Sequence, residues 1–222
     1  MRTANLTIKL ALLSVHANAV QVALTSTQPR ALPTVDALQD ESLDSAAWGG
    51  IETMTGNRIG YIEQLYTFSF PGNTDGGIII SYLGLIASSV DLRGDWVWTS
   101  QSDAFPLIGE RDQLILEYAM IRLRAKIGYT TIAFQLMPKS FTLSELQQTY
   151  ESILSRQLDP RNFRRGMVSS GLLEPENAQR RDGSHRPAAL YRFSGEHDPA
   201  SYLTPLTRAT GTEIGPSNEG PQ

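Results

Sequence analysis

Two short helices joined by a tight turn constrain the C-terminal half of this 222-residue chain most strongly. The first helix is expected from 142 to 155, because Thr142 and Glu145 have the spacing of a capping box, in which each side chain binds the other residue's backbone amide. The second is expected to begin after Asp159, with Pro160 at its first position, and to end at Gly171. Two helices joined by about four residues predict a helix-turn-helix.

The second helix and the segment after it are basic in an otherwise acidic chain. The formal net charge is -4, yet residues 156–192 hold eight Arg, no Lys and four acids, a local charge of +4. Guanidinium and amide groups suit guanine and adenine edges as well as phosphates. We therefore expect DNA contacts from the helix region (Arg156, Arg161, Asn162, Arg164 and Arg165) and from the segment after it (Arg180, Arg181, Ser184, His185 and Arg186). A solvated basic face on a dimerisation domain is the alternative.

A β-hairpin is expected after this pair of helices. Residues 172–174 begin one strand and residues 188–193 form its partner, with a polar turn over residues 177–186. Helix-turn-helix and hairpin together predict a winged helix that binds double-stranded DNA. From residue 195 the chain is rich in Gly, Pro, Ser and Thr, which is typical of a flexible tail.

The first half of the chain alternates strands and a helix. Its expected strands cover residues 6–15, 20–25, 61–70, 78–86 and 96–98, and its expected helix covers residues 41–54. This alternation predicts an α/β or α+β unit, and the whole chain is expected to be α+β. The apolar run near the N-terminus is interrupted by Lys9 and His16, so a buried strand explains it better than a secretory signal. The chain has no Cys, which excludes disulfides and thiolate metal sites and fits the cytoplasm.

A long helix is expected over residues 110–126. Its apolar face is expected to hold four evenly spaced residues and three that broaden it, namely Leu114, Tyr118, Ile121 and Ala125 with Ile115, Met120 and Leu123. We expect this helix to connect the two halves, and it is a candidate for dimer contacts.

Three stretches of the C-terminal half, residues 134–147, 158–165 and 185–193, resemble the winged-helix half of Nudix-related transcriptional regulators. Residues 61–68 and 117–126 are similar to a strand of the Nudix half and to the linker helix of that family. The resemblance implies a Nudix-like α/β/α sandwich at 1–108, a linker helix at 109–130, a winged helix at 131–194 and a tail at 195–222.

The resemblance also implies a function. Members of the family are usually dimeric repressors, and many sense ADP-ribose, NAD or related nucleotides such as ATP. The chain looks closest to the NadQ-type branch, which is implied to repress genes of NAD biosynthesis. The expected partners are a DNA operator, a small nucleotide effector and a second subunit, in the cytoplasm. A nucleotide-binding adaptor protein is a further alternative.

The catalytic sequence of Nudix hydrolases is eroded in this chain. Aligning it on Glu41 and Gly56 places Val35 at its first Gly, and replaces the metal-binding acids by Gly50 and by Thr53-Met54. Hard cations need several oxygen ligands on one face, so no metal, no cofactor and no hydrolase activity are expected. The alternative is a nucleotide diphosphate hydrolase with a displaced metal site, built on Glu41 and Glu52.

A nucleotide could still bind to the sheet without being cleaved. The candidate ligands are Arg30 for phosphate, Glu63 and Gln64 for adenine or ribose, Tyr66 and Phe68 for stacking, and Arg58. Core packing is the alternative for the two aromatic residues, and an ordinary surface position is the alternative for the two arginines.

Overall fold

The computed structural model describes residues 6–36, 41–58, 60–70, 77–180 and 188–195. Its first half is built on a six-stranded sheet with the order β4-β5-β1-β2-β6, to which β3 adds by pairing with β1. The strands are β1 (Leu6–His16), β2 (Ala19–Thr25), β3 (Thr34–Val35), β4 (Tyr61–Phe70), β5 (Gly77–Leu85) and β6 (Trp96–Ser100). β1 and β5 run parallel, whereas the other pairs are antiparallel. β4 and β6 are therefore the edge strands.

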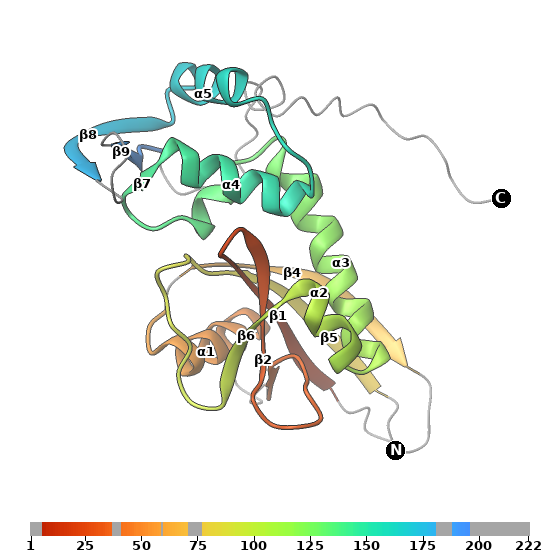
Figure 1. Ribbon diagram of the computed structural model, residues 1–222. Helices are drawn as coiled ribbons and strands as arrows, with labels where there is room; N and C mark the ends of the chain where they lie inside the picture. The colour runs from red at the N-terminus through yellow and green to blue at the C-terminus, as the bar shows by residue number, and fades with distance from the viewer. Residues whose placement is uncertain (1–5, 37–40, 59, 71–76, 181–187, 196–222) are drawn as a thin grey trace.

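One helix covers each face of this sheet (Figure 1). Residues Ile8, Leu10 and Leu12 of β1 pack with α1 (Leu43–Thr55), while Ala11 and Leu13 pack with α3 (Glu110–Ile127). This division follows from the alternation of side chains along a strand. α2 (Gln101–Ala104) and the 3-10 turn η1 (Phe105–Leu107) lead from β6 into α3. The arrangement confirms the expected α/β/α sandwich.

Local signals define α1. The side chain of Ser42 accepts a hydrogen bond from the amide of Ser45, so the helix begins at Leu43, two residues later than expected. At the other end Gly56 adopts φ 78°, and its amide binds the carbonyl of Glu52. This left-handed conformation favours glycine, which explains why the helix ends there.

The inner face of α3 differs from the expected one. Ile115, Met120 and Leu123 are buried as expected, but the side chains of Tyr118 and Ile121 are 40% and 64% exposed. The residues that pack against the sheet are instead Ile115, Leu116, Ala119, Met120, Leu123 and Ile127. Of the four evenly spaced residues, Tyr118, Ile121 and Ala125 are exposed, whereas Leu114 is half-buried against the core.

The second half is a winged helix. Its three-stranded sheet has the order β7-β9-β8, from β7 (Phe141–Thr142), β8 (Leu173–Arg180) and β9 (Ala188–Phe193). The 3-10 turn η2 (Ile132–Leu136) precedes it, and its helices are α4 (Leu143–Leu154) and α5 (Pro160–Ser169). β8 continues through Arg180, where a polar turn was expected. The expected tail lies outside the described residues from residue 196 on.

The caps of α4 and α5 are confirmed. Thr142 and Glu145 form the capping box, with bonds of 3.1 Å and 2.7 Å between each side chain and the other residue's amide. Asp159 accepts from the amide of Asn162 at 2.8 Å at the start of α5. One hydrophobic cluster joins both halves, because it includes Leu13 of β1, Ile115 of α3 and Phe163 of α5. No helix within the described residues is both long and apolar enough to span a membrane.

Candidate DNA-binding face and effector pockets

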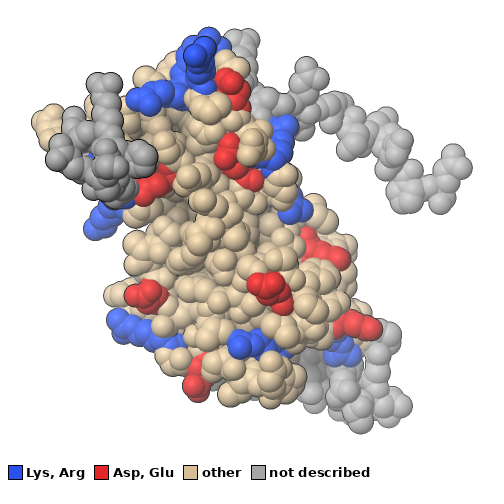
Figure 2. Space-filling view, viewed as in Figure 1, with Lys and Arg blue, Asp and Glu red and all other residues tan. Residues whose placement is uncertain are grey.

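The outer surface of α5 is basic. Arg161, Asn162, Arg164 and Arg165 are exposed, because the i, i+4 pair Phe163 and Met167 takes the inward positions with 1% and 0% exposure. Phe163 packs edge-on against Tyr150 of α4 at 5.4 Å between ring centroids, which fixes the rotation of the helix. Figure 2 shows basic side chains at the end of the molecule that α5 forms.

Hydrogen bonding also organises this surface. Nη2 of Arg165 donates to Oδ1 of Asn162 at 2.9 Å, so the guanidinium and the amide are held side by side. Arg156 is exposed just after α4. Base edges and phosphates accept hydrogen bonds from such groups. All five residues expected from the helix region are exposed.

Arg180 does not fit the expected phosphate contact. Its Nη1 lies 2.6 Å from Oε1 of Glu145, and its Nη2 donates to the carbonyl of Ser140 at 3.3 Å. The guanidinium therefore ties β8 to the capping box of α4, a contact that no sequence pattern predicted. Arg181, Ser184, His185 and Arg186 lie outside the described residues.

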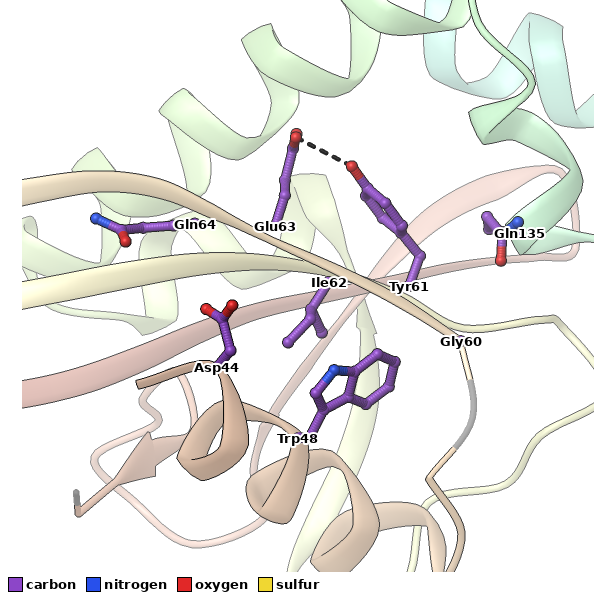
Figure 3. Close-up of a pocket in the computed structure, with 8 residues that line it drawn as sticks. All are labelled: Asp44, Trp48, Gly60, Tyr61, Ile62, Glu63, Gln64 and Gln135. Atoms are coloured by element: carbon purple, nitrogen blue, oxygen red, sulfur yellow. Dashed lines mark hydrogen bonds between the residues drawn. The ribbon is translucent and has the colours of Figure 1, made fainter. Parts of the chain in front are cut away.

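A pocket of about 500 Å³, called here the junction pocket, lies along the edge strand β4. Figure 3 shows Tyr61 and Glu63 on one side of the strand and Ile62 facing Trp48 on the other. The pocket is lined by Asp44 and Trp48 of α1, Gly60 and residues 61–64 of β4, and Gln135 of η2. It therefore touches both halves of the chain.

An ion pair connects the junction pocket to α3. Nζ of Lys126 binds Oε2 of Glu63 and lies 3.2 Å from the hydroxyl of Tyr61, which itself donates to Oε2 of Glu63 at 3.0 Å. Burial and the neighbouring Glu63 raise the pKa of Tyr61. Burial acts against the charge of Lys126, but its bonds to Glu63 and Tyr61 outweigh this and raise its pKa. Lys126 therefore stays charged and anchors the Glu63 side chain.

Two carboxylates line the junction pocket, and that of Glu63 is only partly satisfied by the described residues. Oε1 of Glu63 is buried and has no hydrogen-bond partner within the described residues. Asp44 accepts through Oδ1 from the hydroxyl of Tyr82 at 2.5 Å. Burial, and then this bond, raise the pKa of Tyr82. The pocket thus offers acceptor oxygens suited to the hydroxyl groups of a sugar.

The six expected ligand residues do not form one site. Glu63 and Gln64 line the junction pocket, and the guanidinium of Arg58 stacks over the ring of Trp48 at 5.3 Å, beside it. Arg30 donates to the carbonyl of Thr25 at 3.0 Å and lines neither described pocket.

The two aromatic candidates, Tyr66 and Phe68, pack against Tyr118 of α3. Phe68 is 7% exposed and belongs to the core, which was the alternative to a stacking role for this residue. Tyr66 is 50% exposed and packs against Phe68 and Tyr118 of α3, at 4.9 Å and 5.2 Å between ring centroids. Neither lines the junction pocket, so stacking there would fall to Trp48, which no sequence pattern singled out.

A second pocket of about 420 Å³ lies on the flank of α1 where a Nudix enzyme would carry its acids. We call it the box pocket, because three of its lining residues, Gly50, Thr53 and Met54, occupy the positions of the catalytic sequence that have lost their acids. Glu41 and Trp96 also line it. A Cβ atom at Gly50 would lie 2.5 Å from Cγ2 of Val35 and 2.9 Å from Cδ1 of Leu10. The described residues contain no group of three His, Cys, Asp or Glu that could hold a metal.

Comparison with known proteins identifies relatives of the whole arrangement. A family model described as the NrtR DNA-binding winged helix domain matches residues 133–193. The ADPR responsive transcriptional repressor NtrR of Acinetobacter baylyi is 33% identical over 206 residues, covering 85% of this chain and 82% of that protein.

Solved structures agree with this result. Shewanella oneidensis NrtR complexed with a 27mer DNA superposes with a TM-score of 0.75 at 27% identity, over 89% of this chain and 96% of that one. A MutT/nudix family protein from Enterococcus faecalis has a TM-score of 0.69 at 20% identity, over 87% and 89%, and supports the fold alone. The expected architecture, a Nudix-like sandwich followed by a winged helix, is therefore confirmed. The chain belongs to the NrtR family of Nudix-related transcriptional regulators.

Proposed function

We propose that this protein is a transcriptional repressor that binds a double-stranded DNA operator through α5 and responds to ADP-ribose or a related nucleotide such as NAD or ATP. One observation carries the proposal: α5 buries Phe163 and Met167 and presents Arg161, Arg164 and Arg165 outward from a winged helix. The Acinetobacter relative, described as an ADPR responsive transcriptional repressor, supports the same activity.

The proposed effector site is the junction pocket. Two cations adjoin it, because Lys126 pairs with Glu63 and the guanidinium of Arg58 stacks over the ring of Trp48. The free oxygen of Glu63 would accept from a ribose hydroxyl, Gln64 would bind polar groups of the sugar or base, and Trp48 would stack on the adenine. Gln135 belongs to the segment that the winged-helix family model covers, so the same ligand would reach both halves.

The box pocket is the second candidate for the effector. It occupies the flank of α1 that carries the eroded catalytic positions, and Trp96 gives it an aromatic surface. Like the junction pocket, it is lined by two acids, here Asp36 and Glu41, and by no Lys or Arg, so the charge of the lining does not separate the two candidates.

We propose further that the protein is not a hydrolase. Gly50, Thr53 and Met54 leave the box pocket without the carboxylates that a magnesium site needs. Incubation with ADP-ribose, NADH and diadenosine substrates plus magnesium should give no product. Turnover abolished by Glu41→Gln would establish the hydrolase alternative.

The wider biology follows from the resemblance. We propose a cytoplasmic homodimer that represses genes of NAD biosynthesis. The domain limits of 1–108, 109–130, 131–194 and 195–222 are part of this proposal.

DNA binding is tested with two arginines of α5 and a matched control. Replacing Arg164 and Arg165 by Ala should weaken operator binding by about 2–6 kcal/mol, if each makes a good contact worth about 1–3 kcal/mol. The control is Arg192→Ala, because Arg192 is 61% exposed in the same domain but pairs with Glu174 on the hairpin. Fluorescence anisotropy on upstream DNA measures both. Equal affinities for the α5 variant and the wild type would reject the role of α5.

Effector binding is tested by comparing the two pockets. Calorimetry with ADP-ribose should show weaker binding for Glu63→Gln, which loses the carboxylate, and for Gln135→Ala. Gly49→Trp is the matched variant for the box pocket, because a side chain at Gly49 meets open space and would project into that pocket. Loss of binding in Gly49→Trp alone would move the effector to the box pocket.

A further inference from the structure

One exposed apolar side chain lies among the arginines of α5. Val168 is 55% exposed, and within the described residues of the winged helix it is the only large hydrophobic residue exposed to this extent. It follows Arg164 and Arg165 by one helical turn and Arg161 by two, so the four side chains project from one side of α5. We call these four residues the α5 stripe. The helix that carries them forms the end of the molecule opposite the six-stranded sheet (Figure 1).

Val168 contributes little to the stability of its own subunit. Phe163 and Met167 already hold α5 to the core, with 1% and 0% of their surface exposed. Val168 leaves more than half of its surface in water, so it buries little apolar area, and its branched Cβ restricts its rotamers in a helix. Single exposed apolar residues are common on proteins. What distinguishes Val168 is its place in a stripe of three arginines that are proposed to face DNA.

The major groove of DNA offers one apolar group that matches Val168. Guanine, adenine and cytosine present hydrogen-bond acceptors and amino groups there, whereas thymine alone also presents a methyl group, at C5. The side chain of Val168 has no donor or acceptor, so it can bind neither a phosphate nor a polar base edge. An aliphatic side chain in a stripe of guanidinium groups therefore fits a thymine methyl group that lies next to base acceptors or phosphates.

We propose that Val168 is a specificity-determining residue, which recognises the 5-methyl group of a thymine in the major groove of the operator. This role rests on the proposed function of α5. One helical turn advances by about 5.4 Å along the helix axis, and one base pair advances by about 3.4 Å along the duplex. The thymine should therefore lie within about two base pairs of the bases that Arg164 and Arg165 contact.

The α5 stripe is already ordered for such a contact. Nη2 of Arg165 donates to Oδ1 of Asn162 at 2.9 Å, which holds that guanidinium beside the amide. Valine in a helix adopts one strongly preferred rotamer, so its two methyl groups are presented with little further loss of side-chain freedom. The edge-on packing of Phe163 against Tyr150 fixes the rotation of α5 and therefore the direction in which the stripe points.

The first test removes methyl groups from the protein. The operator is a duplex that the full-length wild type selects from random-sequence DNA, and binding is measured by fluorescence anisotropy. Val168→Ala should weaken binding about fourfold for each α5 that binds, the effect of losing one methyl contact with an apolar partner. Urea unfolding should give this variant a midpoint no lower than that of the wild type.

Leu107→Ala is the matched control. Leu107 is also apolar and is 40% exposed, but it belongs to η1, outside the winged helix. This variant should bind the operator as tightly as the wild type does.

The second test removes the methyl group from the DNA. Each thymine of the operator is replaced in turn by deoxyuridine, which lacks only the 5-methyl group. At one position of each half-site this replacement should weaken binding of the wild type about fourfold and leave that of Val168→Ala unchanged there. At every other thymine the wild type and the variant should respond alike.

Two results would overturn the proposal. One is a Val168→Ala variant that binds the operator as tightly as the wild type. The other is a loss of affinity in Val168→Ala that stays the same whichever thymine methyl group is removed, because no methyl group would then explain the contact. In both cases wild-type binding to the operator would leave the proposed function intact. A wild type that selects no DNA at all would refute the proposed function itself, together with this role of Val168.

Discussion

Two adjacent glycines of α1 should respond in opposite ways to the same substitution. Gly49 is exposed, and a Cβ atom there would meet nothing within 4 Å, whereas a Cβ atom at Gly50 would lie 2.5 Å from Cγ2 of Val35. Replacing Gly by Ala inside a helix gains about 1 kcal/mol. Gly49→Ala should therefore stabilise the protein by about that amount.

Gly50→Ala gains the same helix propensity but must also be accommodated by Val35 and Leu10. Val has a stiff side chain and Leu10 is fully buried, so neither neighbour moves easily. Overpacking of this kind costs about 1–3 kcal/mol, which leaves a net change from about zero to a loss of about 2 kcal/mol. The two variants should thus differ by about 1–3 kcal/mol.

Urea unfolding at 25 °C measures this difference as a shift of midpoint at constant slope. A double-mutant cycle with Val35→Ala should show that Gly50→Ala costs less once the Val35 methyl groups are gone. Equal stabilities for Gly49→Ala and Gly50→Ala would refute the steric argument. A Glu at position 50 alone would therefore not rebuild a metal site, because Val35 fills the space where that side chain would start.

Three further outcomes follow from the packing. Asp112→Ala should destabilise the protein by about 3–5 kcal/mol in urea unfolding, since it leaves Lys9, paired at 2.6 Å and largely buried, without its partner. Burial lowers the pKa of His16 below its ordinary 6.5, so the folded state resists protonation of this side chain. The free energy of unfolding therefore falls as the pH drops below that value, and His16→Phe should lose less stability than the wild type between pH 7 and pH 5. Thr142→Ala should cost about 1 kcal/mol through loss of the α4 cap, and an unchanged midpoint would contradict the capping box.

The winged-helix half could be predicted from the sequence because its signals are local. Thr142 with Glu145 and Asp159 with Pro160 each define a helix start within four residues, and the structure confirms both. The inner face of α3 could not be chosen in this way. Two apolar stripes lie side by side on that helix, and only packing against the sheet decides which is buried.

The candidate site was only partly predictable for a similar reason. Glu63 and Gln64 stood out as polar residues on a strand, but Trp48 and Gln135 come from distant segments that meet only in the folded chain. The pairing of Arg180 with Glu145 was hidden because each residue belongs to a motif with its own explanation, the wing and the capping box. Counting charges along the sequence cannot show which of them neutralise each other.

The hydrophobic cluster that runs from β1 through α3 into α5 limits how this protein can move. A swivel of the winged helix on the sheet would open that cluster to water, at about 25 cal/mol for every square ångström uncovered. The sandwich and the winged helix should therefore move together as one rigid unit. A nucleotide bound in the junction pocket would then displace α5 together with the sheet, and not by loosening one half from the other.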